Sequence, residues 1–114
     1  MREARLTRKE SGEVIMSRCF VTENSLERMR GLLGRQSLAS DEALWIQPCN
    51  NVHTFFMKFS IDVVFMNSQG RILKIYSSMK PWKTHWPVWK ASIALEMPEG
   101  ASSKLREGDC LCLS

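Results

Sequence analysis

The sequence predicts a mostly β, α+β domain: a small antiparallel barrel or rolled sheet of six to seven short strands with one packed helix. Short runs of β-branched and aromatic residues recur along the chain, and Gly, Pro and Asn separate them. Only one stretch has helical periodicity. The chain has 114 residues, 44% hydrophobic and 25% charged, which is ordinary for a globular protein with one core.

The first 13 residues, MREARLTRKESGE, are highly charged and contain no apolar segment typical of a secretory signal. We expect residues 1–13 to form a flexible tail, followed by a single β-rich domain over residues 14–114. No apolar run approaches the roughly 20 residues that span a bilayer. These features lead us to expect a soluble, cytoplasmic protein.

The four cysteines, Cys19, Cys49, Cys110 and Cys112, are expected to be free thiols. No pair has Cys-x-x-Cys spacing and neither histidine lies in a zinc-finger pattern, so we predict no metal site and no cofactor. A metal site that uses Cys49 and His53 is the alternative. We interpret the cysteines as small core residues in a reducing compartment.

The densest β-forming stretch lies between residues 51 and 77. Residues 61–66 (IDVVFM) have apolar side chains on both faces, which predicts a strand covered on both sides. Asn67 and Gly70 are typical of a turn, because glycine takes the left-handed conformation without steric cost. Alternation resumes in residues 71–77, so we predict a β-hairpin.

The other elements follow from similar patterns. Leu26, Met29 and Leu33 recur at helical spacing, which predicts an amphipathic helix over residues 25–33 that packs through this face. Asn24 before it is a good N-cap. The remaining expected strands are residues 14–21, 43–47, 52–58, 91–97 and 110–113, with a loop at 81–90 and a turn or short helix at 99–106.

Six short motifs occur in a fixed order along the chain. They are RGLL with Arg35 (residues 30–35), HTFFMK (53–58), IDVVF (61–65), GR (70–71), LEMPEG (95–100) and GD (108–109). In this order the chain resembles a family of bacterial and archaeal proteins, domain of unknown function 192. The resemblance implies a compact, single-domain, β-rich fold and no established activity. Members often carry a signal peptide, and often have a tryptophan where this chain has Phe56.

Four polar residues interrupt apolar strands: His53, Lys58, Asp62 and Glu96. Burial of an unpaired charge is costly, so such residues are usually paired or lie at a cleft. We predict that their side chains converge on one ligand-binding cleft at a mouth of the barrel, with the loop 81–90 at its rim. Lys58 would bind an anion, and Asp62 or Glu96 would act as acceptor or base. The alternative is a structural network around Asp62.

Residues 71–90 contain five Lys or Arg, no Asp or Glu, and three of the four tryptophans. Indoles beside cations stack on bases or sugars and attract phosphates, so Trp82 and Trp86 are also candidate ligand-binding residues. The alternative is that the tryptophans cover an open end of the barrel while the lysines stay hydrated. One basic stretch without a nucleic-acid motif does not favour nucleic-acid binding.

The chain contains no P-loop, dinucleotide-binding, nucleophile-elbow or HExxH motif, so the sequence does not decide whether it is an enzyme. We predict a non-catalytic binding or accessory module whose partner is a small anionic ligand or a protein. Arg28, Arg30 and Arg35 would face such an anion or form a solvated helix surface. The alternatives are a small hydrolase-like enzyme with a carboxylate base, and a binder of an anionic polymer through the tryptophan-rich loop.

Overall fold

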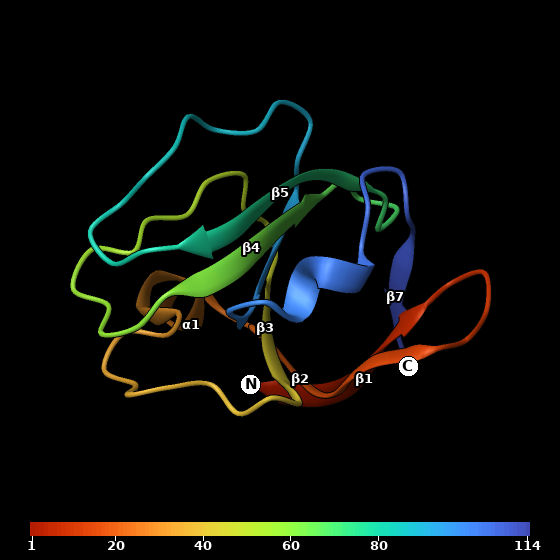
Figure 1. Cartoon of the computed structure of the whole chain (residues 1–114), viewed down its shortest axis with the longest axis horizontal. Coiled ribbons are helices and arrows are strands. Elements are labelled where there is room, and N and C mark those ends of the chain that lie inside the picture. Colours follow the sequence, from red (N-terminus) through yellow and green to blue (C-terminus); the bar gives the residue numbers. More distant parts are fainter.

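The computed structural model describes all 114 residues, and its main feature is one curled, seven-stranded sheet that forms a half-barrel (Figure 1). The strand order is β5-β4-β6-β3-β2-β1-β7. Neighbouring strands are antiparallel except for β2 and β3, which are parallel. The predicted mostly β fold is confirmed. The elements are β1 (Arg2–Arg8), β2 (Val14–Val21), α1 (Ser25–Arg30), β3 (Glu42–Ile46), β4 (Ile61–Met66), β5 (Ile72–Met79), β6 (Ile93–Pro98), the 3₁₀ helix η1 (Ala101–Lys104) and β7 (Leu111–Leu113).

The predicted hairpin is confirmed, because β4 and β5 pair antiparallel. The amide of Gly70 donates to the carbonyl of Asn67 at 3.0 Å, and Gly70 has a φ of 82°. The amide of Leu111 donates to the carbonyl of Gly70 at 2.9 Å, so the start of β5 lies against β7. A Cβ at position 70 would overlap the carbonyl oxygen of Leu111, so this contact between the two edges of the sheet requires glycine.

The amino-terminal segment belongs to the sheet, so the expected tail over residues 1–13 is wrong for residues 2–8. β1 pairs with β2 on one side and with β7 on the other. Leu6 is fully buried, and Ala4 packs against the same core. Ala4 and Leu6 alternate with charged residues, and this alternation is typical of a strand that is covered on one face.

The helix is shorter and less buried than predicted. It begins as expected, because the Asn24 side chain accepts a hydrogen bond from the Glu27 amide at 2.9 Å. Gly31 then ends it with a φ of 52°. None of its residues is buried, and Leu26 and Met29 are 75% and 77% exposed. The predicted packing is therefore wrong for Leu26 and Met29, whereas Leu33, which follows the helix, packs partly buried against the core. Neither this helix nor η1 has the length and apolarity needed to cross a membrane.

The predicted strand over residues 52–58 is absent. His53 makes one isolated bridge with Thr84, and the hydroxyl of Thr54 accepts a hydrogen bond from the Lys83 amide at 2.8 Å. These contacts tie the segment to the tryptophan-rich loop instead of to the sheet. In Figure 1 the two loops lie side by side beyond the ends of β4 and β5.

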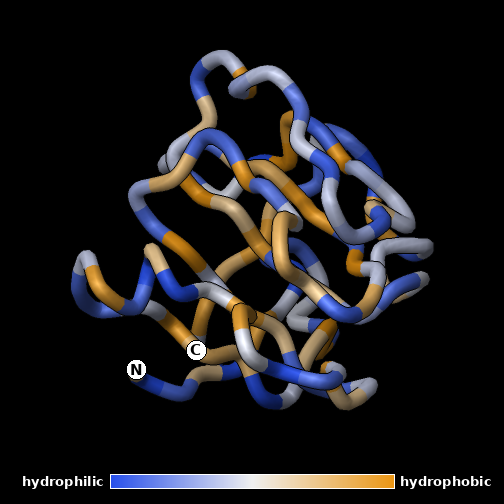
Figure 2. The backbone as a smooth tube through the Cα atoms, turned by 90° about the vertical axis from the view of Figure 1, so that its left-hand side faces the viewer, coloured by the Kyte–Doolittle hydropathy of each residue, from blue (hydrophilic) through white to orange (hydrophobic).

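Two hydrophobic clusters cover the two faces of the sheet. The first cluster takes alternate residues from all seven strands, such as Val64, Leu95 and Met97. The second cluster takes residues of the opposite parity from β3, β4 and β6, such as Val63, and adds Met57 and other loop residues. Figure 2 shows hydrophobic segments running through the middle of the molecule and many hydrophilic segments in the outer loops. Successive residues of β4 or β6 therefore face different clusters.

Candidate functional site

Asp62 is fully buried and lies in a complete hydrogen-bond network. Its Oδ1 accepts from the Ser78 amide at 2.8 Å, and its Oδ2 accepts from the amide and hydroxyl of Ser102 at 3.0 and 2.5 Å. Burial by itself raises the pKa of the Asp62 carboxyl, but these hydrogen bonds outweigh it and lower the pKa below its ordinary value. Asp62 thus links β4 to β5 and η1, which is the arrangement expected of a structural network.

Glu96 is only 5% exposed, and it lacks such a network. Its Oε1 has no hydrogen-bond partner, and no ion pair involves its carboxyl. It lies on β6, in register with Leu44 of β3 and Val63 of β4. Burial raises the pKa of Glu96 to about 7. A buried carboxyl without a partner costs stability, so its presence calls for a reason other than folding.

Glu96 lines a small cavity of about 90 Å³ beside α1. Gly31 lies next to the carboxyl, since a Cβ at position 31 would be 3.7 Å from Oε1. His53 lines the same cavity, so the structure brings together two of the four predicted polar residues. One water molecule in the liquid takes up about 30 Å³, so this cavity has room only for a small ligand. The other side chains with polar or sulfur atoms in its wall are Arg28, Met29, Arg30, Cys49, Asn51 and Met57.

The prediction of a single cleft is wrong for the remaining two residues. Asp62 is in register with Met97 across β4 and β6, and the next pair is Val63 with Glu96. Because successive residues of a strand point to opposite faces, Asp62 and Glu96 lie on opposite sides of the sheet. Lys58 is exposed and does not line the cavity of Glu96. A base role for Asp62 is disfavoured, because both of its oxygens already accept hydrogen bonds.

Trp82 and Trp86 lie outside this cavity. They are 59% and 91% exposed, so neither covers an open end of the sheet. Trp82 contacts the ring of Phe56, with the ring centroids 4.6 Å apart. The tryptophans therefore form a surface feature that is separate from the buried carboxyl.

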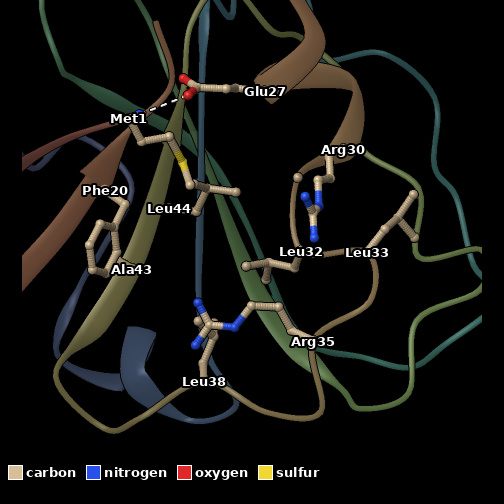
Figure 3. Close-up of a pocket in the computed structure, with 11 residues that line it drawn as sticks. Met1, Phe20, Glu27, Arg30, Leu32, Leu33, Arg35, Leu38, Ala43 and Leu44 are labelled. Carbon is tan, nitrogen blue, oxygen red and sulfur yellow. Dashed lines mark hydrogen bonds and ion pairs between the residues drawn. The ribbon is translucent and has the colours of Figure 1, made fainter.

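A larger pocket of about 320 Å³ shares residues 30–33 with the small cavity and extends toward β2 and β3 (Figure 3). Its walls are mainly apolar and include Phe20, Leu32, Leu38 and Leu44. At its edge the amine of Met1 lies 2.7 Å from the Glu27 carboxylate. Sequence reasoning did not find this pocket, because its walls come from β2, β3 and the connection after α1.

Two arginines turn toward the larger pocket (Figure 3). The guanidinium of Arg35 is 3.0 Å from Glu42, which also pairs with Arg18. Arg30 makes no hydrogen bond or ion pair through its side chain and is exposed. It also lines the cavity of Glu96. The sequence signal for this site was the set of arginines around RGLL.

The cysteines and histidines do not assemble a metal site. No three His, Cys, Asp or Glu side chains come close enough to share one metal ion. The Cys49 thiol donates to the carbonyl of Asn51 at 3.0 Å, and burial raises its pKa. Burial therefore favours the protonated thiol of Cys49 in the cavity of Glu96. All four cysteines are free.

Known proteins with similar sequences are UPF0127 proteins of archaea. The chain is 34% identical over 56 residues to PH1112 of Pyrococcus horikoshii, covering 49% of this chain and 48% of that protein. It is 28% identical over 100 residues to a Thermococcus sibiricus protein, covering 83% of this chain and 64% of the relative. The chain thus spans less than two thirds of the length of these two relatives.

Two solved structures share the fold. A protein of unknown function from Novosphingobium aromaticivorans DSM 12444 has a TM-score of 0.79 and 18% identity, with 96% of this chain and 83% of that chain covered. A Sinorhizobium meliloti 1021 protein also has a TM-score of 0.79, with 20% identity and coverages of 97% and 92%. The model of the DUF192 family, described as "Uncharacterized ACR, COG1430", matches residues 6–112. The chain therefore belongs to the DUF192 family.

Proposed function

We propose that this protein is a binding module for a small amino compound whose ammonium group faces Glu96. The observation that carries the proposal is the buried Oε1 of Glu96, which has no hydrogen-bond partner and borders a cavity. A ligand that donates a hydrogen bond there would supply the missing partner. An ammonium donor would also stabilise the ionised carboxylate, which burial disfavours.

The other residues that line the cavity indicate a more specific class of ligand. Arg28 and Arg30 also line this cavity, and both carry a positive charge. A cationic ligand alone would be repelled by them, whereas a ligand that also carries a carboxylate would be held by charge-assisted hydrogen bonds. The class that fits is a small zwitterion of the amino-acid type. This retains the predicted anionic group, but places it at these arginines and not at Lys58.

The test is a set of small probes that differ in charge: glycine, methylammonium, acetate and tetramethylammonium. Binding is measured by calorimetry, and the Glu96 pKa by carboxyl NMR. We expect glycine to bind more tightly than methylammonium or acetate, and to move the Glu96 titration below 7. Tetramethylammonium has no N–H group and should leave the titration unchanged.

The matched variants are Glu96→Gln and Glu99→Gln. Glu99 is exposed and three positions away, so its change controls for charge alone. Glu96→Gln should weaken glycine binding at least tenfold, about 1.4 kcal/mol, and Glu99→Gln should leave it unchanged. Equal binding by both variants, or no binding of any probe, would contradict the proposal.

A second candidate function uses the larger pocket of Figure 3. Arg30 presents a guanidinium without a partner beside apolar walls, and the volume of about 320 Å³ is at the lower end of ligand sites. This combination suits a carboxylate with a short apolar tail. Hexanoate should then bind more tightly than hexanol, and Arg30→Met should remove that preference. Arg28→Met is the control, because Arg28 lies on the same helix but does not line this pocket.

We also infer a reducing, cytoplasmic location. The inference is supported by the four unpaired cysteines, two of which, Cys19 and Cys49, have thiol pKa values raised by burial. Disulfides are rare in such compartments. Thiol titration of the denatured, unreduced native protein should count four thiols, and a count of two would contradict the inference.

A further inference from the structure

Two adjacent loops, residues 51–60 and 80–91, display large aromatic side chains to solvent. Phe56, Trp82, Trp86 and Trp89 are 70%, 59%, 91% and 84% exposed. We call these four residues, with the lysines of the same loops, the aromatic face. Isolated exposed apolar residues are common, but a concentration of this kind marks an interaction surface.

The backbone of the two loops takes an uncommon conformation at two of these four rings and at one lysine. Phe56, Trp82 and Lys90 have φ values of 66°, 65° and 68°, and Ser78 is the only other non-glycine residue with a positive φ. Bulky side chains rarely adopt this conformation, so the surrounding structure must enforce it. Hydrogen bonds between the loops do so: the Trp82 amide donates to the Thr54 carbonyl at 2.9 Å.

All charged residues of the two loops are positive. Between residues 43 and 95 the chain has six Lys or Arg and a single acid, Asp62, which is fully buried. The cations in the two loops are four lysines, Lys58, Lys80, Lys83 and Lys90, and all are exposed. The rest of the chain carries ten Lys or Arg and eleven Asp or Glu, so the positive potential is concentrated on this part of the molecule.

We propose that the aromatic face docks onto an anionic phospholipid surface. Tryptophan favours the interfacial layer of a bilayer, because its ring is largely apolar while its N–H group remains near water. Lysines that surround such rings are attracted by the negative surface potential of anionic lipids. Rings held outward by fixed loops would enter this layer without rearrangement of the sheet.

Two features favour a lipid surface over a nucleic acid. The loops contain lysines and no arginine, whereas arginine is the preferred residue for nucleic-acid recognition. Trp86 and Trp89 each project separately and make no ring–ring contact. A single-strand binding groove would instead offer a row of rings along a backbone track.

The experiment is co-sedimentation of the full chain with vesicles, with tryptophan fluorescence as a second readout. Vesicles contain phosphatidylcholine alone or phosphatidylcholine with about one third phosphatidylserine. We expect binding at least tenfold stronger to the anionic vesicles, a blue shift of the emission, and loss of binding at about 0.5 M NaCl. Equal binding to both vesicles, or none to either, would overturn the proposal.

Matched double variants test whether the aromatic face is responsible. Trp86→Ala with Trp89→Ala should weaken vesicle binding at least tenfold, and Lys80→Gln with Lys83→Gln should weaken it severalfold. All four side chains are exposed, so denaturant unfolding should be unchanged. The controls are Val14→Ala with Leu26→Ala, which removes exposed apolar side chains elsewhere, and Lys9→Gln with Lys104→Gln.

Two further outcomes would contradict the proposal, and both can be measured. If the control pairs weaken vesicle binding as much as the face variants do, the face is not the docking surface. A thymidine oligonucleotide of about 20 residues is assayed in parallel. Binding of this oligonucleotide without binding of anionic vesicles would overturn the lipid assignment in favour of a nucleic acid.

Discussion

Asp62 and Glu96 are buried carboxyls on adjacent strands and opposite faces of the sheet, and they differ in their hydrogen-bond partners. Asp62 accepts three hydrogen bonds from Ser78 and Ser102, whereas the Oε1 of Glu96 has none. The pKa is lowered for Asp62 and raised to about 7 for Glu96. Burial is common to both, so the supply of donors decides whether a buried carboxyl stabilises the fold or is left available for a ligand.

Glu42 supports this interpretation as a third case. It is 6% exposed, close to the value for Glu96. Its carboxylate accepts from the Ala39 amide at 2.9 Å and pairs with Arg18 and Arg35, each at 3.0 Å. The hydrogen bond from the Ala39 amide is the largest cause of its lowered pKa. Among these three buried carboxyls, Glu96 alone lacks partners.

The largest effect is expected for Asp62→Asn. The amide cannot accept from all three donors, so at least one buried N–H or O–H loses its partner and the charge assistance is lost. We expect the free energy of unfolding at pH 7 to fall by about 4 kcal/mol in urea melts. Because its folded-state pKa is lowered, the stabilisation by Asp62 is present above its ordinary pKa and is lost as pH falls through the folded value. The difference between wild type and variant should shrink in acid.

Ser102→Ala is the control for this prediction. It removes one donor, the hydroxyl, and leaves the carboxylate with the two amides. The loss should be smaller, about 1–2 kcal/mol. A neutral effect of Asp62→Asn would show that its network does not stabilise the fold and would remove the contrast with Glu96.

The next largest effect is expected for Glu96→Gln, which should raise the free energy of unfolding where Asp62→Asn lowers it. Because the folded-state pKa of Glu96 is raised, the folded protein binds a proton that the unfolded chain has lost, and stability falls as pH rises from about 4.5 to about 7. The difference between the ordinary pKa of 4.5 and the folded-state pKa of about 7 corresponds to about 3 kcal/mol. Relative to wild type, Glu96→Gln should therefore gain up to about 3 kcal/mol between pH 5 and pH 8.

Glu99→Gln provides the matched comparison, because Glu99 is exposed. Urea melts of the wild type, Glu96→Gln and Glu99→Gln at pH 5 and pH 8 distinguish the contributions of the two carboxyls to stability. The same pH dependence of stability for Glu96→Gln and Glu99→Gln would show that Glu96 does not have a raised pKa in the folded protein.

The smallest effect is expected for Gly31→Ala. Its φ of 52° and ψ of −126° are adopted readily only by glycine, so we expect a loss of about 2 kcal/mol. Gly34→Ala is the control, with a φ of 86° and no atom within 4 Å of an added Cβ. The added methyl at position 31 would lie near Oε1 and should also raise the pKa of Glu96, measured by NMR. A change of that pKa by both variants would show that the effect is not local.

The local features of the fold were predictable from the sequence. The hairpin follows from one apolar strand, a turn at Asn67 and Gly70, and a second alternating strand. The strand over residues 14–21 and the Asn24 cap were also placed correctly. Each of these depends on neighbours within a few residues, which the sequence shows directly.

The site was only partly predictable, because it depends on register between strands. Asp62 and Glu96 look alike in sequence, as acids inside apolar strands. Their faces differ only because Asp62 is in register with Met97 and Glu96 with Val63. Alternation over residues 52–58 also suggested a strand, but contacts of Thr54 with the neighbouring loop hold it in a different conformation. Such tertiary contacts override local pattern.

The most direct measurement is a carboxyl NMR titration that follows Asp62 and Glu96 in the same sample of the unliganded protein. We expect a midpoint near 7 for Glu96 and a midpoint below the ordinary value of 3.8 for Asp62. A Glu96 midpoint near its ordinary value of 4.5 would contradict the assignment of Glu96 as a buried carboxyl without a partner, because it would mean that the carboxyl is solvated or already has a partner in the folded protein.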